Sequence, residues 1–281
     1  MADRVPLSLG LAVAIWTIAG EGAALPIVVA HRGYSAVAPE NTVAAIDAAV
    51  GFADWVEFDV RETLDGELIL MHDSRLRRTT NGGGLVANSS LAHIRSLDAG
   101  LWFGDAFAGE QVPTLAEAIQ ASFSGGLVPL IERKTGSPSL YVDALHELGV
   151  AEDVVLQSFD WAFLANVHLL APEIALGALG SGQLNGVELS DLKASGVSII
   201  AWKGTGTSPS LVNQVHVQEL DLFVWTIDQP GGILNFLELG VDGIISNDPG
   251  LVRALIPEPS TATLVASGLV GLLVAGRRRA A

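Results

Sequence analysis

Two acidic side chains, Glu57 and Asp59, lie two residues apart in an apolar run that predicts a β-strand over residues 55–60. Because alternate residues of a strand point to the same side, both carboxylates are expected on one face. A third acid, Glu132, ends a similar run over residues 128–132. The chain has no cysteine, and three carboxylates without a thiolate suit one hard divalent ion, Ca²⁺ or Mg²⁺. These acids are therefore candidate metal ligands.

Basic and titratable side chains follow the same kind of apolar run. His31 and Arg32 come directly after residues 27–30, and Lys134 lies two residues beyond Glu132. His72 follows the short apolar run 68–71. Two histidines beside a metal suit general acid–base catalysis near neutral pH. The pattern therefore predicts that the acids, the histidines, Arg32 and Lys134 converge on one pocket.

Each of these residues also has a structural interpretation. His31 can be a hydrogen-bonded structural histidine, and Glu57 and Asp59 can be exposed residues of an edge strand. Lys134 can pair with Glu132, and Asn41 has the type and position of a helix N-cap. The combination favours function, because three buried acids are costly unless a metal or another charge neutralises them. We therefore expect metal-assisted catalysis.

Alternating strands and helices are predicted to position these residues. The expected strands are 27–30, 55–60, 128–132, 154–158, 174–179, 198–201, 222–226 and 243–246. The expected helices include 41–52, 114–122, 139–148, 161–170 and 232–239. This order predicts an α/β fold, a TIM (β/α)₈ barrel, with an open doubly wound sheet as the alternative. The long interval between residues 60 and 128 predicts a small insertion after the second strand. Active sites of such barrels lie at the carboxyl ends of the strands, where the candidate residues fall.

The charge of the chain limits its partners. The sequence has 31 acidic and 15 basic residues and a formal net charge of −16. Binding of nucleic acid depends on a basic face, so we expect no nucleic-acid partner. The high content of hydrophobic residues, 49%, is sufficient for a sizeable buried core.

The two ends of the chain differ in composition from the part between them. Residues 1–24 contain a short apolar run followed by small residues, which is typical of an export signal peptide. An uncleaved N-terminal helix is the alternative. At the other end, Pro257-Glu258-Pro259 precedes an apolar run over 261–276 and three arginines. At 1.5 Å per residue that run spans about 24 Å, slightly less than the ~30 Å hydrocarbon core of a membrane.

This tail, residues 257–281, resembles the PEP-CTERM sorting signal of exopolysaccharide-producing bacteria. The resemblance implies an exosortase-type processing enzyme as a partner and membrane contact through the C-terminal segment before processing. A generic tail anchor is the alternative. We therefore expect an exported protein, located at the bacterial cell surface, in the periplasm or in the extracellular matrix. The catalytic domain is expected over residues 25–256.

Ordered motifs across residues 29–252 resemble the glycerophosphodiester phosphodiesterase family. They include HRGYSAVAPENT, EFDVRETLDGELILMHDSRLRRTTNGGG, VPTLAEAI, IERK, LQSF, FVWTID and GVDGIISNDP. The resemblance implies a TIM barrel with an insertion after the second strand. It also implies metal-dependent hydrolysis of small-molecule glycerophosphodiesters to sn-glycerol 3-phosphate and an alcohol.

The family's functional residues fall on matching positions of this chain. The resemblance implies that the metal ligands are Glu57, Asp59 and Glu132 and that the catalytic histidines are His31 and His72. It implies that Arg32 and Lys134 bind the phosphate and that Trp225 forms the aromatic wall near the glycerol. We expect one histidine to act as base and the other as acid, and favour His31 as the base.

One motif departs from the family's pattern. Ser246-Asn247-Asp248-Pro249 stands where the usual sequence is closer to Thr-Asp-x-Pro, which leaves the role of Asp248 open. Arg133 stands where a small or apolar residue is more usual, and we interpret it as structural.

Two other functions are kept as alternatives. One is a sphingomyelinase D-like phospholipase that acts on membrane lipid, and the other is a catalytically silent surface-matrix protein.

Overall fold

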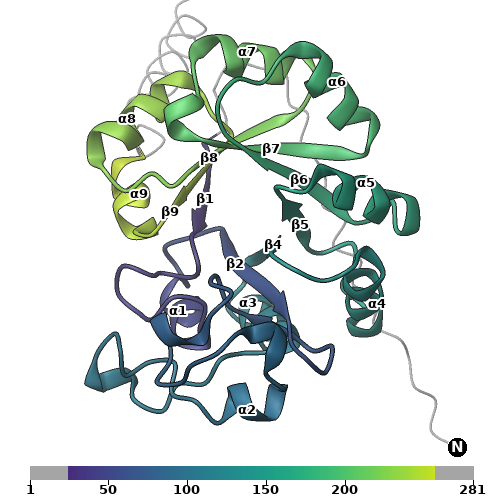
Figure 1. Ribbon diagram of the computed structural model, residues 1–281. Helices are drawn as coiled ribbons and strands as arrows, with labels where there is room; N and C mark the ends of the chain where they lie inside the picture. Colours follow the sequence, from purple (N-terminus) through teal and green to yellow (C-terminus); the bar gives the residue numbers. More distant parts are fainter. Residues whose placement is uncertain (1–24, 257–281) are drawn as a thin grey trace, which may run out of the picture.

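Eight parallel strands close into a barrel in this computed structural model, which describes residues 25–256 (Figure 1). The predicted export signal, residues 1–24, and the predicted sorting tail, residues 257–281, lie outside the described residues. The barrel strands are β1 (Ile27–Ala30), β2 (Trp55–Glu62), β4 (Val128–Arg133), β5 (Val155–Ser158), β6 (Ala175–Gly180), β7 (Val197–Lys203), β8 (Asp221–Trp225) and β9 (Gly243–Ser246). Each predicted strand overlaps one of these.

The first strand closes the ring. β1 pairs in parallel with β9 on one side and with β2 on the other, so the sheet has no free edge at this point. The remaining strands pair in the order β9-β8-β7-β6-β5-β4-β2. The predicted TIM barrel is therefore confirmed, and the open doubly wound sheet is excluded.

Helices cover the outside of the barrel (Figure 1). They are α1 (Val43–Ala48), α3 (Leu115–Ser124), α4 (Pro138–Leu148), α5 (Trp161–Leu170), α6 (Gly186–Ala194), α7 (Pro209–Val217), α8 (Pro230–Leu239) and α9 (Pro249–Leu255), and a further helix, α2 (Leu91–Arg95), belongs to the insertion described below. Within residues 25–256, none of them has the length and hydropathy needed to cross a membrane. The N-cap prediction for Asn41 is wrong, because the side chain of Thr42 accepts the Ala45 N–H and caps α1. The Asn41 side chain is used elsewhere, as described below.

The inward-facing residues of the strands form an apolar layer inside the barrel. This layer comprises Val29, Leu130, Val155, Leu179, Ile199, Ala201, Phe223 and Ile245. Outward-facing neighbours such as Val28, Phe58 and Ile244 belong to a separate apolar cluster between the strands and the helices. Because strand residues alternate between the two faces, a residue two positions after a member of the inner layer again points inward. This register decides which side chains reach the mouth of the barrel.

The predicted insertion lies between β2 and β4 and begins with β3 (Leu68–Leu70), which pairs antiparallel with β2. It carries a small apolar core of its own, formed by Ile69, Met71, Leu76, Val86, Ile94, Ala99 and Val112. In Figure 1 the segment that contains α2 extends from one side of the barrel. The Met71 N–H donates to the carbonyl oxygen of Asp59 at 2.8 Å, which ties the start of the insertion to β2 and fixes the position of His72.

A tight turn after β1 brings the chain against α1. Arg32 and Gly33 both have positive φ, 58° and 79°. A Cβ atom added to Gly33 would lie 2.5 Å from the carbonyl carbon of Ala45 in α1. The absence of a side chain at Gly33 therefore permits this close approach.

We predict that Gly33→Ala lowers the free energy of unfolding by more than Gly51→Ala does. Gly51 also has positive φ, 81°, but no atom lies within 4 Å of an added Cβ. Strain in the left-handed region costs about 1–2 kcal/mol at both positions, whereas overpacking adds roughly 1–3 kcal/mol at Gly33 alone. Guanidinium unfolding of the two variants measures the difference, and equal losses would contradict the close approach.

Candidate active site

Polar side chains replace the apolar layer at the carboxyl ends of the strands. Glu132 lies two residues beyond Leu130, and Trp225 lies two residues beyond Phe223, so both side chains continue an inward-facing row. Glu57 and Asp59 occupy the same inward-facing register on β2. The predicted site residues therefore gather at one end of the barrel, because the strand register directs them there.

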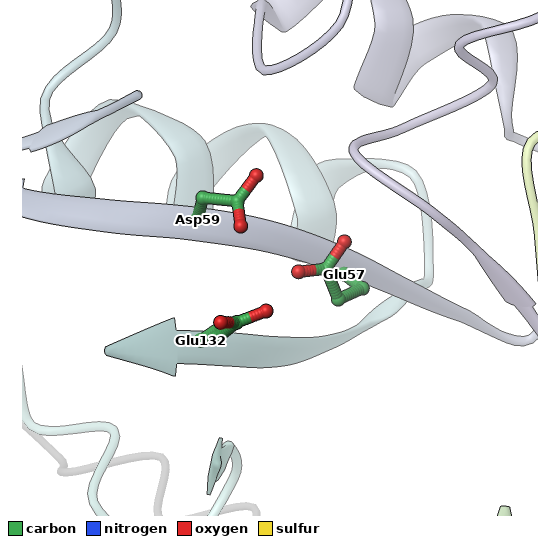
Figure 2. Close-up of side chains that lie close together, drawn as sticks. All are labelled: Glu57, Asp59 and Glu132. Carbon is green, nitrogen blue, oxygen red and sulfur yellow. The ribbon is translucent and has the colours of Figure 1, made fainter. Parts of the chain in front are cut away.

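The three acids form a compact buried cluster. Glu57, Asp59 and Glu132 are 1%, 0% and 7% exposed, and one oxygen of each lies within 4.8 Å of the others. In Figure 2 the carboxylates of Glu57 and Asp59 on β2 extend toward that of Glu132 on β4. Among the described residues, Glu57 Oε1 has no hydrogen-bond partner. A buried, closely spaced, oxygen-only set with an unpaired oxygen fits a hard divalent cation.

The acids cannot easily all be ionised without a cation. Burial, together with the charge of Asp59, raises the pKa of Glu57 to about 8 and that of Glu132 to about 7. Burial also acts on Asp59, but the positive charges of Lys134 and Arg32 outweigh it and lower the pKa of Asp59. A bound divalent cation would favour the ionised form of all three.

Two basic side chains lie against the acids. Lys134 Nζ is 3.0 Å from Asp59 Oδ1 and 2.5 Å from Glu132 Oε1. Arg32 Nε is 3.1 Å from Asp59 Oδ2, and the Arg32 backbone N–H donates to Glu57 Oε2 at 2.9 Å. The predicted pairing of Lys134 with Glu132 is thus present, and it extends to Asp59. Both cations also line the cavity described below, where they are available to an anion.

Each candidate histidine is held through its Nδ1 atom. His31 Nδ1 lies 2.7 Å from Asn247 Oδ1, and its Nε2 lies 3.9 Å from Glu57 Oε2. His72 Nδ1 lies 2.8 Å from Asp73 Oδ1. Burial is the largest influence on both rings and lowers the pKa of each. With Nδ1 engaged in both rings, Nε2 is the atom left to act on a substrate.

The partners of His72 connect the insertion to the barrel. Arg78, in the 3₁₀ helix Leu76–Arg78, donates to both oxygens of Asp73 and to both oxygens of Glu40. Glu40 in turn accepts from Arg32 at 2.9 Å. Arg78 therefore connects the insertion, through Glu40, to the loop after β1.

A cavity of about 250 Å³ opens above the apolar layer. Six of the predicted residues line its charged side, namely His31, Arg32, Glu57, His72, Glu132 and Lys134. An apolar side is formed by Phe159, Leu179, Trp225 and Ile245. Trp225 is fixed by a hydrogen bond from its Nε1 to the Ala201 carbonyl and packs edge-on against Phe159, with ring centroids 5.6 Å apart. The cavity thus combines charged groups for an anion with a surface for carbon atoms.

Several residues that contact the site were not predicted for it. Asn41 binds Asp59 twice, since its Nδ2 donates to Asp59 Oδ2 at 2.8 Å and its Oδ1 accepts the Asp59 N–H at 3.0 Å. Gln157 is 1% exposed, continues the inward row beyond Val155 and lines the cavity. The alternation of inward-facing residues along β5 is the sequence pattern from which Gln157 could have been predicted. The interactions of Asn41 depend on the loop after β1, for which the sequence offers no comparable periodicity.

Structural contacts are present at Asp248, whose role the sequence left open, and at Arg133, which we interpreted as structural. Asp248 accepts the Leu251 N–H at 2.9 Å and caps α9, and it also accepts the Tyr34 hydroxyl at 2.7 Å. Arg133 donates to Asp160 at 3.1 Å and lies 4.6 Å from the centre of the Phe163 ring. The interpretation of Arg133 as structural is therefore confirmed.

Comparisons with known proteins agree with this geometry. Residues 31–251 match the glycerophosphoryl diester phosphodiesterase family. A glycerophosphodiester phosphodiesterase of Caldanaerobacter subterraneus is 36% identical over 237 residues, which cover 82% of this chain and 97% of the relative.

Solved structures are similar as well. A phosphodiesterase from Oleispira antarctica, solved in complex with the product sn-glycerol-3-phosphate, has a TM-score of 0.77 at 29% identity, covering 83% of this chain and 97% of its own. A glycerophosphodiester phosphodiesterase from Agrobacterium tumefaciens has a TM-score of 0.73 at 31% identity, with coverages of 82% and 100%. The chain described here therefore belongs to the glycerophosphoryl diester phosphodiesterase family and is a phosphodiesterase.

Proposed function

We propose that this enzyme hydrolyses glycerophosphodiesters to sn-glycerol 3-phosphate and an alcohol by general acid–base catalysis with two histidines. The observation that carries the proposal is the convergence of His31, His72, Glu57 and Glu132 on one cavity, with Asp59 in the same cluster of acids but not lining the cavity. The structure from Oleispira antarctica, solved with sn-glycerol-3-phosphate as its product, supports the choice of reaction.

Glu57, Asp59 and Glu132 would hold one divalent ion, Ca²⁺ or Mg²⁺. When bound, such an ion supplies Lewis-acid stabilisation of charge on a phosphoryl oxygen. Arg32 and Lys134 lie beside the acids and line the same cavity, so they place two fixed positive charges where a phosphodiester enters. Preorganised cations of this kind stabilise negative charge that grows in the transition state. Trp225 offers an apolar surface for the carbon atoms of the glycerol.

The different partners of the two histidines support different roles. The Asp73 carboxylate accepts the Nδ1–H of His72 and offsets part of the lowering of the His72 pKa that burial causes. His31 faces a neutral amide at Nδ1, which stabilises a protonated ring less than a carboxylate does. We therefore assign His31 Nε2 as the base that takes a proton from the nucleophile, either water or the glycerol 2-hydroxyl. Attack by water gives sn-glycerol 3-phosphate directly, whereas attack by the 2-hydroxyl first gives a cyclic phosphate, which a water molecule must then open to give the same product. His72 is the acid that gives a proton to the leaving alkoxide.

We also propose that the protein is exported and that an exosortase-type enzyme processes its tail. The composition of residues 1–24 and the Pro-Glu-Pro, apolar and arginine order of residues 257–281 support this. Mass spectrometry of the protein from its native cells tests the proposal, because intact ends at residues 1 and 281 would contradict both cleavages.

Purified enzyme is expected to release sn-glycerol 3-phosphate from glycerophosphocholine or glycerophosphoethanolamine. Exhaustive chelation should abolish the activity, and added Mg²⁺ or Ca²⁺ should restore it, because the three acids would otherwise repel one another and the phosphate. Sphingomyelin and lysolipid serve as comparison substrates. Preferential turnover of those lipids would favour the sphingomyelinase D-like alternative, and no turnover of any substrate with either metal would favour the silent matrix protein. Full activity after chelation would contradict the metal.

Replacing either catalytic histidine should remove most of the activity while the fold is retained. A positioned acid or base contributes about 10²–10⁴-fold to the rate, so kcat of His31→Asn and of His72→Asn should fall by that factor. His93→Asn is the matched control, since His93 is an exposed residue of α2 outside the site. Steady-state kinetics and circular dichroism provide the measurement. Normal kcat in either of the first two variants would rule out its assigned role.

A further inference from the structure

We propose that Asn247 and Asp228 form a positioning pair that fixes the ring orientation and the tautomer of His31. The inference rests on the proposed function of His31 as the base. Asn247 follows β9 and lies two residues beyond Ile245, a member of the inner apolar layer. Its Oδ1 atom is 2.7 Å from His31 Nδ1, so Asn247 approaches the ring from the side opposite to the atom that acts on substrate.

Asp228 holds the other end of the Asn247 side chain. Asn247 Nδ2 donates to Asp228 Oδ2 at 2.6 Å. The backbone N–H of Asn247 and the hydroxyl of Ser246 donate to Asp228 Oδ1 at 2.8 and 3.0 Å. Three donors on two oxygens suit a carboxylate that only accepts hydrogen bonds.

This arrangement permits one orientation of the Asn247 amide. Because the Asp228 carboxylate accepts only, the NH₂ group of Asn247 must face it and the amide oxygen must face His31. The hydroxyl of Ser35 lies 2.9 Å from the same amide oxygen and 2.8 Å from the His31 carbonyl oxygen, so its single hydrogen can serve either acceptor and leaves the orientation to Asp228. An amide oxygen cannot donate, so His31 Nδ1 must carry the hydrogen. In the neutral ring the lone pair is then on Nε2, which lies 3.9 Å from Glu57 Oε2.

The pair therefore fixes the orientation and tautomer of the His31 ring, as the Asp73 carboxylate does alone for His72. The group in contact with the His31 ring is the neutral Asn247 amide. Asp73 touches His72 directly, whereas Asp228 reaches His31 only through the Asn247 amide. Asn247 and Asp228 act through His31 and are positioning residues.

Exchanging the two side chains tests the inference. Asn247→Asp alone places two carboxylates in contact, and we expect kcat to fall by about 100-fold, within the range of a general base. Asp228→Asn alone releases the amide orientation, and a loss of about 10-fold is expected, as for other residues that orient a functional histidine. In the double exchange the amide at position 228 can donate to the carboxylate at position 247, so the hydrogen bond between the two side chains is restored. Its kcat should therefore exceed that of Asn247→Asp by about 10-fold or more. KM should change little throughout.

Matched controls are Asn166→Asp and Asp191→Asn, which make the same changes on exposed positions of α5 and α6. Wild-type kcat in Asn247→Asp, or a double exchange no better than that single variant, would overturn the proposal. These comparisons are made only if the wild-type enzyme turns over a glycerophosphodiester. An inactive wild-type enzyme would contradict the proposed function, whereas the kinetics of the variants test the positioning pair.

A second readout does not depend on activity or on the Asn247 and Asp228 variants. The ¹⁵N shifts of the neutral His31 ring in wild-type protein with Mg²⁺, assigned by comparison with His31→Asn, report which nitrogen carries hydrogen. We expect hydrogen on Nδ1, and hydrogen on Nε2 would overturn the proposal even if the kinetic results agreed with it.

Discussion

Mutual repulsion among three buried carboxylates is the constraint on which the rest of the site depends. Glu57, Asp59 and Glu132 lie within 4.8 Å of one another at the mouth of the barrel, in positions almost without solvent. Burying such a group without a partner is costly. The chain supplies Lys134 and Arg32 to offset part of the charge, and Asn41 to fix Asp59, yet Glu57 retains an oxygen without a partner among residues 25–256. The remaining negative charge makes the cluster suited to a cation.

The barrel makes this arrangement possible because a packed apolar layer lies below the site. Leu130 and Phe223 lie in the apolar layer, and Glu132 and Trp225 follow them by two residues on the same strands. Packing of the lower layer therefore sets the direction of the side chains above it. Inserted and looped segments add the groups that the strands do not supply. His72 lies on the insertion. Hydrogen bonds from Arg78 to Asp73 and Glu40 connect that insertion to the loop after β1.

The sequence was sufficient to predict the parts of the site that depend on strand periodicity. Glu57, Asp59 and Glu132 could be placed together because each occupies a fixed register in an apolar run. The partners were not predictable in the same way. Asn41 was expected to cap a helix, since the sequence cannot distinguish an N-cap from a residue turned toward a neighbouring strand. Asn247 and His31 are separated by 216 positions, and only the closure of β1 onto β9 brings them together.

The most direct test of the account is to locate the metal. Diffraction data from crystals soaked with Ca²⁺, collected at a long wavelength where calcium scatters anomalously, would show the ion without reference to activity. The account predicts one strong anomalous peak about 2.0–2.6 Å from an oxygen of each of Glu57, Asp59 and Glu132, the range of magnesium and calcium ligands. No peak at these carboxylates, or a peak bound only elsewhere on the barrel, would contradict it.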